Sequence, residues 1–171
     1  MWLVSDANIF IDMEVGGVLD FMFSLPETIA VPDVLYAEEL EKQHPHLLKM
    51  GLKPLEVRAE FVDEAWRMGG LYPKPSQNDL LALSLAKQEQ CPLLTGDARL
   101  REAALCEGVD VRGTLWLMER LFAAKVLDIA QIEAAYEKMR HENRRLPWQD
   151  VEAQLQRLRD SEPNKATIKI G

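Results

Sequence analysis

The sequence predicts a three-layer α/β/α sandwich with a five-stranded parallel sheet, followed by a C-terminal helical extension. This α/β fold class depends on two observations. Five short apolar runs, rich in branched side chains, alternate with helical patterns over residues 1–126. Parallel strands are joined by right-handed helical crossovers, so this alternation predicts helices on both faces of one sheet.

The predicted elements follow one another along the chain. The strands are 2–5 (WLVS), 28–32 (TIAVP), 54–58 (PLEVR), 91–95 (CPLLT) and 109–113 (VDVRG). The helices cover residues 7–24, 33–43, 59–69, 77–90, 98–107 and 114–126.

After Asp128 the pattern is only helical. Asp128 and Gln131 form a capping box before a stripe that includes Tyr136, and a second helix begins near Pro147. We therefore expect a domain at 1–126, a helical appendage packed on it at 127–160 and a mobile tail at 161–171, where ATIKI could add an edge strand. The alternative role of the appendage is a surface for a second subunit or a partner protein.

Composition favours a soluble, cytoplasmic protein. Hydrophobic residues make up 47% of the 171 residues, but no window approaches the ~20 apolar residues of a membrane span, and no secretory signal is expected. The net charge of −8 repels nucleic acid, so a polyanionic ligand would need local attraction.

The cysteines and histidines give weak indications. Cys91 and Cys106 form no metal or disulfide pattern, and both are expected in the core. His44, His46 and His141 could be metal ligands, but a His-Pro-His turn is more typical of a solvated loop.

Four acids fall near the carboxyl ends of the predicted strands, where ligands bind in parallel α/β sheets. Asp6 and Asp97 each follow a strand, Asp79 lies in the first turn of the helix before one, and Glu38 lies on the helix after another. Helix capping alone explains the three aspartates, Asp79 through a box with Ser76. Capping does not explain Glu38, which lies on the stripe expected to face the core and would need a partner there.

Carboxylates gathered at one end of a sheet repel one another unless a cation or a shared proton lies among them. Oxygen ligands without His or Cys favour a hard cation, Mg²⁺ or Mn²⁺. Such an ion would join the acidic protein to a phosphodiester and activate water, so the acids suggest phosphate chemistry.

Five segments together resemble the PIN-domain ribonucleases, and most closely their toxin-like (VapC-type) branch. These segments, spread over residues 1–126, are VSDANIFID, VPDVLYAEEL, SQNDLLALSLA, LLTGDARLREAA and VRGTLWLMERL. By position, the resemblance implies that the metal-site and catalytic acids are Asp6, Glu38, Asp79 and Asp97, with Glu39 as the rival of Glu38 and with Asn8, Thr95 and Thr114 as supporting residues.

The resemblance implies hydrolysis of RNA by a metal-activated water, with Asp6 and Asp97 holding Mg²⁺ or Mn²⁺ most directly. Arg99 and Arg101 could contact RNA phosphates, although a solvated helix face explains them as well. A weaker candidate is the basic run RHENRR, with Arg140, Arg144 and Arg145. A small antitoxin protein and a second copy of the chain are the expected protein partners.

Alternative functions remain open. A haloacid-dehalogenase-like phosphatase would need a second Asp where Asn8 stands, and a phospho-acceptor receiver domain would be expected to show a Lys after the last strand. A non-catalytic PIN scaffold that acts as a binding module would keep the same fold.

Overall fold

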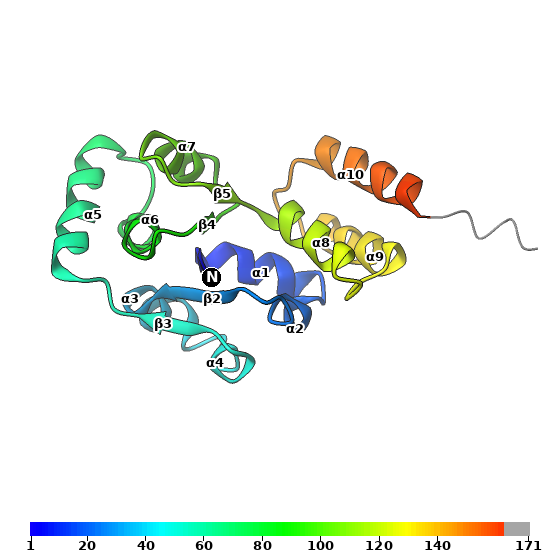
Figure 1. The fold of residues 1–171 in the computed structure, drawn as a ribbon, viewed down its shortest axis with the longest axis horizontal. Coiled ribbons are helices and arrows are strands. Elements are labelled where there is room, and N and C mark those ends of the chain that lie inside the picture. Colours follow the sequence, from blue (N-terminus) through cyan, green and yellow to red (C-terminus); the bar gives the residue numbers. More distant parts are fainter. Residues whose placement is uncertain (163–171) are drawn as a thin grey trace, which may run out of the picture.

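The computed structural model describes residues 1–162, and within them five strands form one all-parallel sheet (Figure 1). The strands are β1 (Trp2–Ser5), β2 (Thr28–Pro32), β3 (Lys53–Leu55), β4 (Leu93–Leu94) and β5 (Val111–Arg112), in the order β3-β2-β1-β4-β5. The predicted α/β fold class is therefore confirmed. The third strand begins one residue earlier than predicted and ends at Leu55.

Helices connect and follow the strands. They are α1 (Ala7–Val15), α2 (Leu19–Met22), α3 (Asp33–Leu35), the π-helix η1 (Tyr36–Leu40), α4 (Leu47–Met50), α5 (Ala59–Leu71), α6 (Gln77–Glu89), α7 (Ala98–Cys106), α8 (Thr114–Ala123), α9 (Ile129–His141) and α10 (Trp148–Ser161).

Both faces of the sheet are covered. Successive side chains of a strand point to opposite faces, and the consecutive residues Leu3, Val4 and Ser5 of β1 are all inaccessible to solvent. In β2 the consecutive residues 29–32 are buried as well. Helices must therefore pack on both faces, as a three-layer arrangement requires.

Two predicted helices differ from those observed. The helix expected over 7–24 is divided into α1 and α2, because Gly17 adopts a φ of 72°, which interrupts the helix. The helix expected over 33–43 ends at Leu40 in a π-helical turn, in which the Glu41 N–H donates to the Tyr36 carbonyl at 2.8 Å. The short helix α4 was not predicted.

The two cysteines have different environments. Cys91 is buried, as expected, but Cys106 is exposed at the end of α7. The prediction that Cys106 lies in the core is therefore wrong, because the preceding residue, Leu105, is also 60% exposed and this end of the helix faces solvent.

The C-terminal helices pack on the rest of the chain. At Gly16, after α1, an added Cβ would lie 2.7 Å from Met139 of α9, so α9 packs closely against the end of α1. Gln154 of α10 accepts a hydrogen bond from the Tyr136 hydroxyl at 2.5 Å and donates to the carbonyl of Leu115 in α8 at 2.8 Å. Helices α8, α9 and α10 thus gather at one end of the molecule (Figure 1).

Among residues 1–162, no helix combines the length and the apolar character needed to span a bilayer. The segment ATIKI and nearly all of the predicted mobile tail lie outside the described residues.

Candidate functional site

The candidate site lies where the strand order reverses. From β1 to β2 to β3 the chain moves toward one edge of the sheet, whereas β4 returns to the other side of β1 and β5 lies beyond it. Val4 pairs with Leu93 and Ser5 with Leu94, so β1 and β4 end side by side. The residues that follow them, Asp6 and Thr95, are thereby placed next to each other at the point where open α/β sheets bind ligands.

Asp6 is the buried acid of the site. Its side chain is inaccessible to solvent, and it begins α1 as the N-cap by accepting a hydrogen bond from the Ile9 N–H at 3.1 Å. The Thr95 hydroxyl donates to Asp6 Oδ2 at 2.5 Å and accepts from the Asp97 N–H at 3.0 Å. Thr95 therefore links the two acids that follow β1 and β4.

The environment of Asp6 changes its acidity. Burial raises the pKa of the Asp6 carboxyl to about 7, and the nearby carboxylates of Asp79 and Asp12 act in the same direction. The hydrogen bonds from Thr95 and the Ile9 N–H oppose this increase. A carboxylate that is costly to ionise in isolation is well suited to a bound cation, which would stabilise its charged form.

Asp97 and Asp79 keep the capping roles expected of them. Asp97 is exposed and accepts from the Arg99 and Leu100 N–H groups at 2.8 and 2.9 Å, which begins α7. Asp79 and Ser76 form the capping box of α6, at 3.0 and 3.1 Å. Since each cap leaves carboxylate lone pairs unused, capping and cation binding are compatible.

The structure places Glu38 differently from the prediction. Glu38 is exposed, and Val34, which marked the stripe expected to face the core, is itself 44% exposed. The π-helical turn changes the periodicity of this segment, so a 3.6-residue stripe does not describe it. The Asn78 side-chain amide donates to Glu38 at 2.8 Å and to its rival Glu39 at 3.1 Å, so both glutamates lie beside the residue that precedes Asp79.

Asp12 is a buried acid that is not among the predicted site residues. It accepts from the Thr114 hydroxyl at 3.1 Å and from Arg144 Nε at 2.6 Å. Thr114 is the first residue of α8 rather than its cap, because Gly113 occupies the cap position. The sequence does carry a signal for a buried Asp12. A charged residue three positions after the apolar Ile9 falls on the same face of a helix, so it needs a partner if that face is buried.

A cleft adjoins the acids, and both arginine and aspartate side chains line it. A cavity of about 300 Å³ is lined by Asn8, Asp12, Gly96, Asp97, Asn143, Arg144 and Arg145. A second cavity, of about 800 Å³, shares Asp12, Gly96 and Arg145 with the first and extends along Arg101, Arg112 and Trp116. We call the two together the arginine cleft. The loop between α9 and α10 forms one of its walls, so the C-terminal extension contributes to the site.

The remaining predicted contact residues have separate positions. Arg101 lines the arginine cleft, whereas Arg99 is exposed and its backbone N–H donates a hydrogen bond to the Asp97 carboxylate. In the basic run, Arg140 lies 4.6 Å from the ring centre of Trp148 and pairs with Glu152, so it joins α9 to α10.

Among residues 1–162, no three of the four predicted acids have ligand atoms within 4.8 Å of one another. The group that meets this limit is Glu14 with His44 and His46. Asp6 and Asp97 are linked through Thr95, Asp79 is close enough to raise the pKa of Asp6, and Glu38 is bound beside Asp79. The donors offer oxygen only, which fits Mg²⁺ or Mn²⁺.

The chain matches a known protein family over nearly its whole length. Residues 2–160 match a family model described as a PIN domain. This match includes α9 and all of α10 except Ser161, and therefore extends beyond residue 126, where the sequence resemblance ends. No curated protein matches the chain.

Proposed function

Since the chain belongs to the PIN-domain family, we propose that it is a metal-dependent ribonuclease with Asp6 and Asp97 at the centre of its active site. The observation that carries this proposal is the buried Asp6 carboxylate, which Thr95 links to Asp97 at the reversal of strand order. Family membership argues against the phosphatase and receiver-domain alternatives. It leaves open a non-catalytic scaffold, which the experiment below tests.

The four acids have two kinds of task in the proposed site. Asp6 and Asp97 would hold Mg²⁺ or Mn²⁺, while Asp79 and Glu38 would complete the ligand set or orient water. The bound ion would supply charge neutralisation at the phosphodiester and activation of the attacking water. Thr95 holds Asp6 through the hydroxyl hydrogen bond, so the buried carboxylate keeps its orientation.

The arginine cleft supports single-stranded RNA as the substrate. Arg101, Arg112 and Arg145 line it and would contact phosphates of the bound strand. The guanidinium groups of Arg112 and Arg120 each lie 5.7 Å from the ring centre of Trp116, so a base that stacks on this ring would displace one of them.

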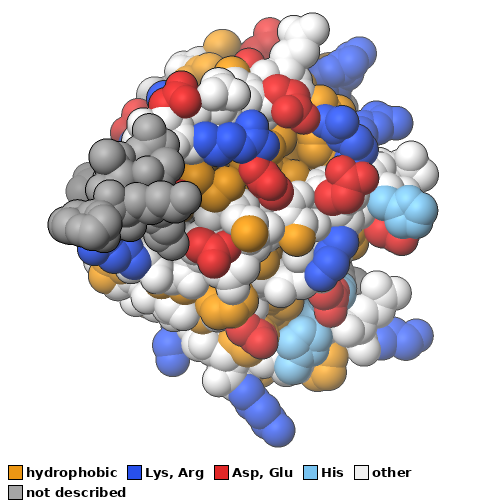
Figure 2. Space-filling view, turned by 90° about the vertical axis from the view of Figure 1, so that its right-hand side faces the viewer, with side chains coloured by type: hydrophobic (Ala, Val, Ile, Leu, Met, Phe, Trp, Pro, Cys, Tyr) orange, Lys and Arg blue, Asp and Glu red, His pale blue; other side chains and the backbone are white. Residues whose placement is uncertain are grey.

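This local cleft resolves the conflict between an acidic protein and an anionic substrate. The net charge of −8 gives no general attraction. On the face that Figure 2 shows, acidic and basic side chains are interspersed, with no continuous basic patch. Attraction would therefore come from the arginines beside the acids, over a distance no longer than the screening length of about 8 Å.

The test is cleavage of labelled single-stranded RNA with Mn²⁺ or Mg²⁺ by the wild type, Asp97→Asn and Asp128→Asn. Asp128 caps α9 with a capping box, so it is a matched control for the loss of a capping carboxylate. We expect Asp97→Asn to abolish cleavage and Asp128→Asn to retain it. Cleavage that persists in EDTA or in Asp97→Asn would overturn the proposal, and RNA binding without cleavage by the wild type would identify a scaffold.

The toxin role, the cytoplasmic location and the protein partners belong to the same proposal. A toxin of this family would arrest growth when expressed alone, and a small antitoxin would restore it. Co-purification with the product of an adjacent gene, and the oligomeric state measured by light scattering, test the two expected partners. Trp66 of α5, 67% exposed, is one apolar side chain available for such a contact.

A further inference from the structure

We propose that Glu14, His44 and His46 form a second metal site, which binds a divalent transition metal ion of the Zn²⁺ type. Unlike the oxygen-only acids at the strand ends, this group combines two imidazoles with one carboxylate. It joins α1 to the loop between η1 and α4.

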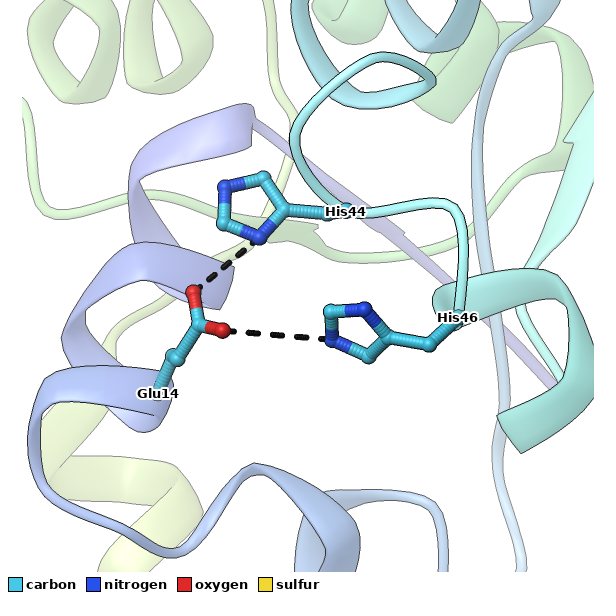
Figure 3. A group of neighbouring side chains, drawn as sticks. All are labelled: Glu14, His44 and His46. Carbon is cyan, nitrogen blue, oxygen red and sulfur yellow. Dashed lines mark ion pairs between the residues drawn. The ribbon is translucent and has the colours of Figure 1, made fainter.

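The three side chains converge on one point. Figure 3 shows the Glu14 carboxylate directed between the two imidazole rings. Glu14 Oε2 lies 3.0 Å from His44 Nδ1, and Oε1 lies 3.9 Å from His46 Nε2. One ligand atom from each residue lies within 4.8 Å of the others. Ligands about 2.0–2.1 Å from a tetrahedral ion are separated by roughly 3.3 Å, so the three atoms need only small shifts to share an ion.

The backbone positions both histidines. The His44 N–H donates to the Leu40 carbonyl at 2.7 Å, and the His46 carbonyl accepts from the Met50 N–H at 3.2 Å. The two ring centres are 6.0 Å apart. The loop therefore presents the imidazoles together, and α1 presents the carboxylate on a regular helix.

His44 Nδ1 is a buried atom that lacks a suitable partner. Within residues 1–162 it makes no hydrogen bond, although it lies 3.0 Å from Glu14 Oε2. The two atoms are close enough for an ion pair, but their relative orientation does not make a hydrogen bond. A buried ring nitrogen without a hydrogen bond is costly, and coordination to a metal ion through the deprotonated Nδ1 would satisfy it.

The donor set determines the class of ion. Imidazole suits Zn²⁺, Ni²⁺, Co²⁺ and Cu²⁺, whereas Mg²⁺ requires oxygen ligands and retains several waters. Two His and one Glu leave a fourth tetrahedral position for water. Because Glu14 and His46 are about half exposed, an ion can reach the site from solvent.

Binding would fix the loop that follows η1 to α1. Glu38 lies on η1 and Asp6 caps α1, so the ion would restrain two segments that carry predicted active-site acids. We therefore expect bound Zn²⁺ to stabilise this part of the fold, with water in the open fourth position.

The experiment measures Zn²⁺ binding to untagged protein by calorimetry, with Cys106→Ser as the background to exclude the exposed thiol. One Zn²⁺ ion should bind per chain, and excess Mg²⁺ should not displace it. His44→Ala and His46→Ala should each weaken binding by more than about 100-fold, which exceeds the 10–100-fold typical of losing a group that only supports a ligand. His141→Ala, the exposed third histidine, should bind Zn²⁺ normally.

Two further measurements do not depend on nuclease activity. Co²⁺ should give the visible absorption of a four-coordinate ion, and Glu14→Gln should remove it. Zn²⁺ at about 100 times its Kd should raise the Tm of the background protein by about 5–10 °C. The proposal is overturned if Zn²⁺ does not bind, or if it binds equally to His44→Ala and His46→Ala variants that fold as judged by circular dichroism. The three residues would then form an ordinary ion-pair group.

Discussion

Replacing Asp6 by Asn should make the metal-free protein more stable at about pH 8, even though it removes a proposed metal ligand. The folded protein keeps the Asp6 proton up to a pH of about 7, whereas the unfolded chain releases it near the ordinary pKa of 3.8. The folded state therefore binds more protons between these values, and its stability falls as the pH rises through this window. Above it, the full cost of ionising a buried carboxyl is present.

The magnitude follows from the pKa and the hydrogen bonds. A pKa of about 7 instead of 3.8 corresponds to about 4 kcal/mol of free energy of unfolding. Asn offers one acceptor oxygen, so it would lose the hydrogen bond from either Thr95 or the Ile9 N–H, at a cost of about 1 kcal/mol. We expect a net gain of about 2–3 kcal/mol near pH 8 and almost none near pH 5.

Urea unfolding in EDTA at the two pH values measures this difference directly, and the expected gain corresponds to an increase in Tm of about 5–10 °C. Asp97→Asn is the matched control, since Asn caps a helix about as well as Asp and the side chain of Asp97 is exposed. This control should show no comparable gain. If Asp6→Asn destabilises the protein equally at both pH values, the assignment of a burial cost to Asp6 is wrong.

Three other predictions concern the same region. Mn²⁺ affinity should rise between about pH 6 and 8, because Asp6 must release its proton to bind the ion. Calorimetry in buffers of different ionisation enthalpy measures the affinity and the protons released, and values that stay constant with pH would contradict the prediction. Arg144→Ala should lower the free energy of unfolding by about 2–4 kcal/mol because it leaves the buried Asp12 unpaired, and adding Asp12→Asn should recover most of the loss in urea unfolding. Arg145→Ala should weaken single-stranded RNA binding, measured by fluorescence anisotropy, and should reduce by about 0.7 the magnitude of the slope of log binding constant against log salt concentration. Lys53→Ala, in the edge strand β3, should leave both the affinity and the slope unchanged.

Local interactions made much of the fold predictable. The five strands are predictable because each lies within or overlaps a short apolar run that alternates with helical patterns. The caps at Asp6, Asp97 and the Ser76 box join residues only two or three apart in sequence. Those spacings are visible in a single sequence. The link between Asp6 and Asp97 through Thr95 is consistent with the rule that neighbouring parallel strands end at the same edge of a sheet.

Contacts between distant segments were not predictable in the same way. The pair formed by Arg144 and Asp12 joins residues 132 positions apart, and no local pattern indicates it. The arrangement of His44 and His46 beside Glu14 depends on the packing of a loop against α1. Glu38 was misplaced because a helical period was assumed over a π-helical turn.

Helix α1 carries Asp6 as its cap, Asp12 within it and Glu14 near its end, so three separate features depend on one helical register. Each residue in a helix turns the chain by about 100° and advances it by about 1.5 Å. Deleting or inserting one residue between Asp6 and Asp12 would rotate the later two side chains away from Arg144 and the histidines together. Length variation among related chains should therefore be absent from this helix and common in the surface loops.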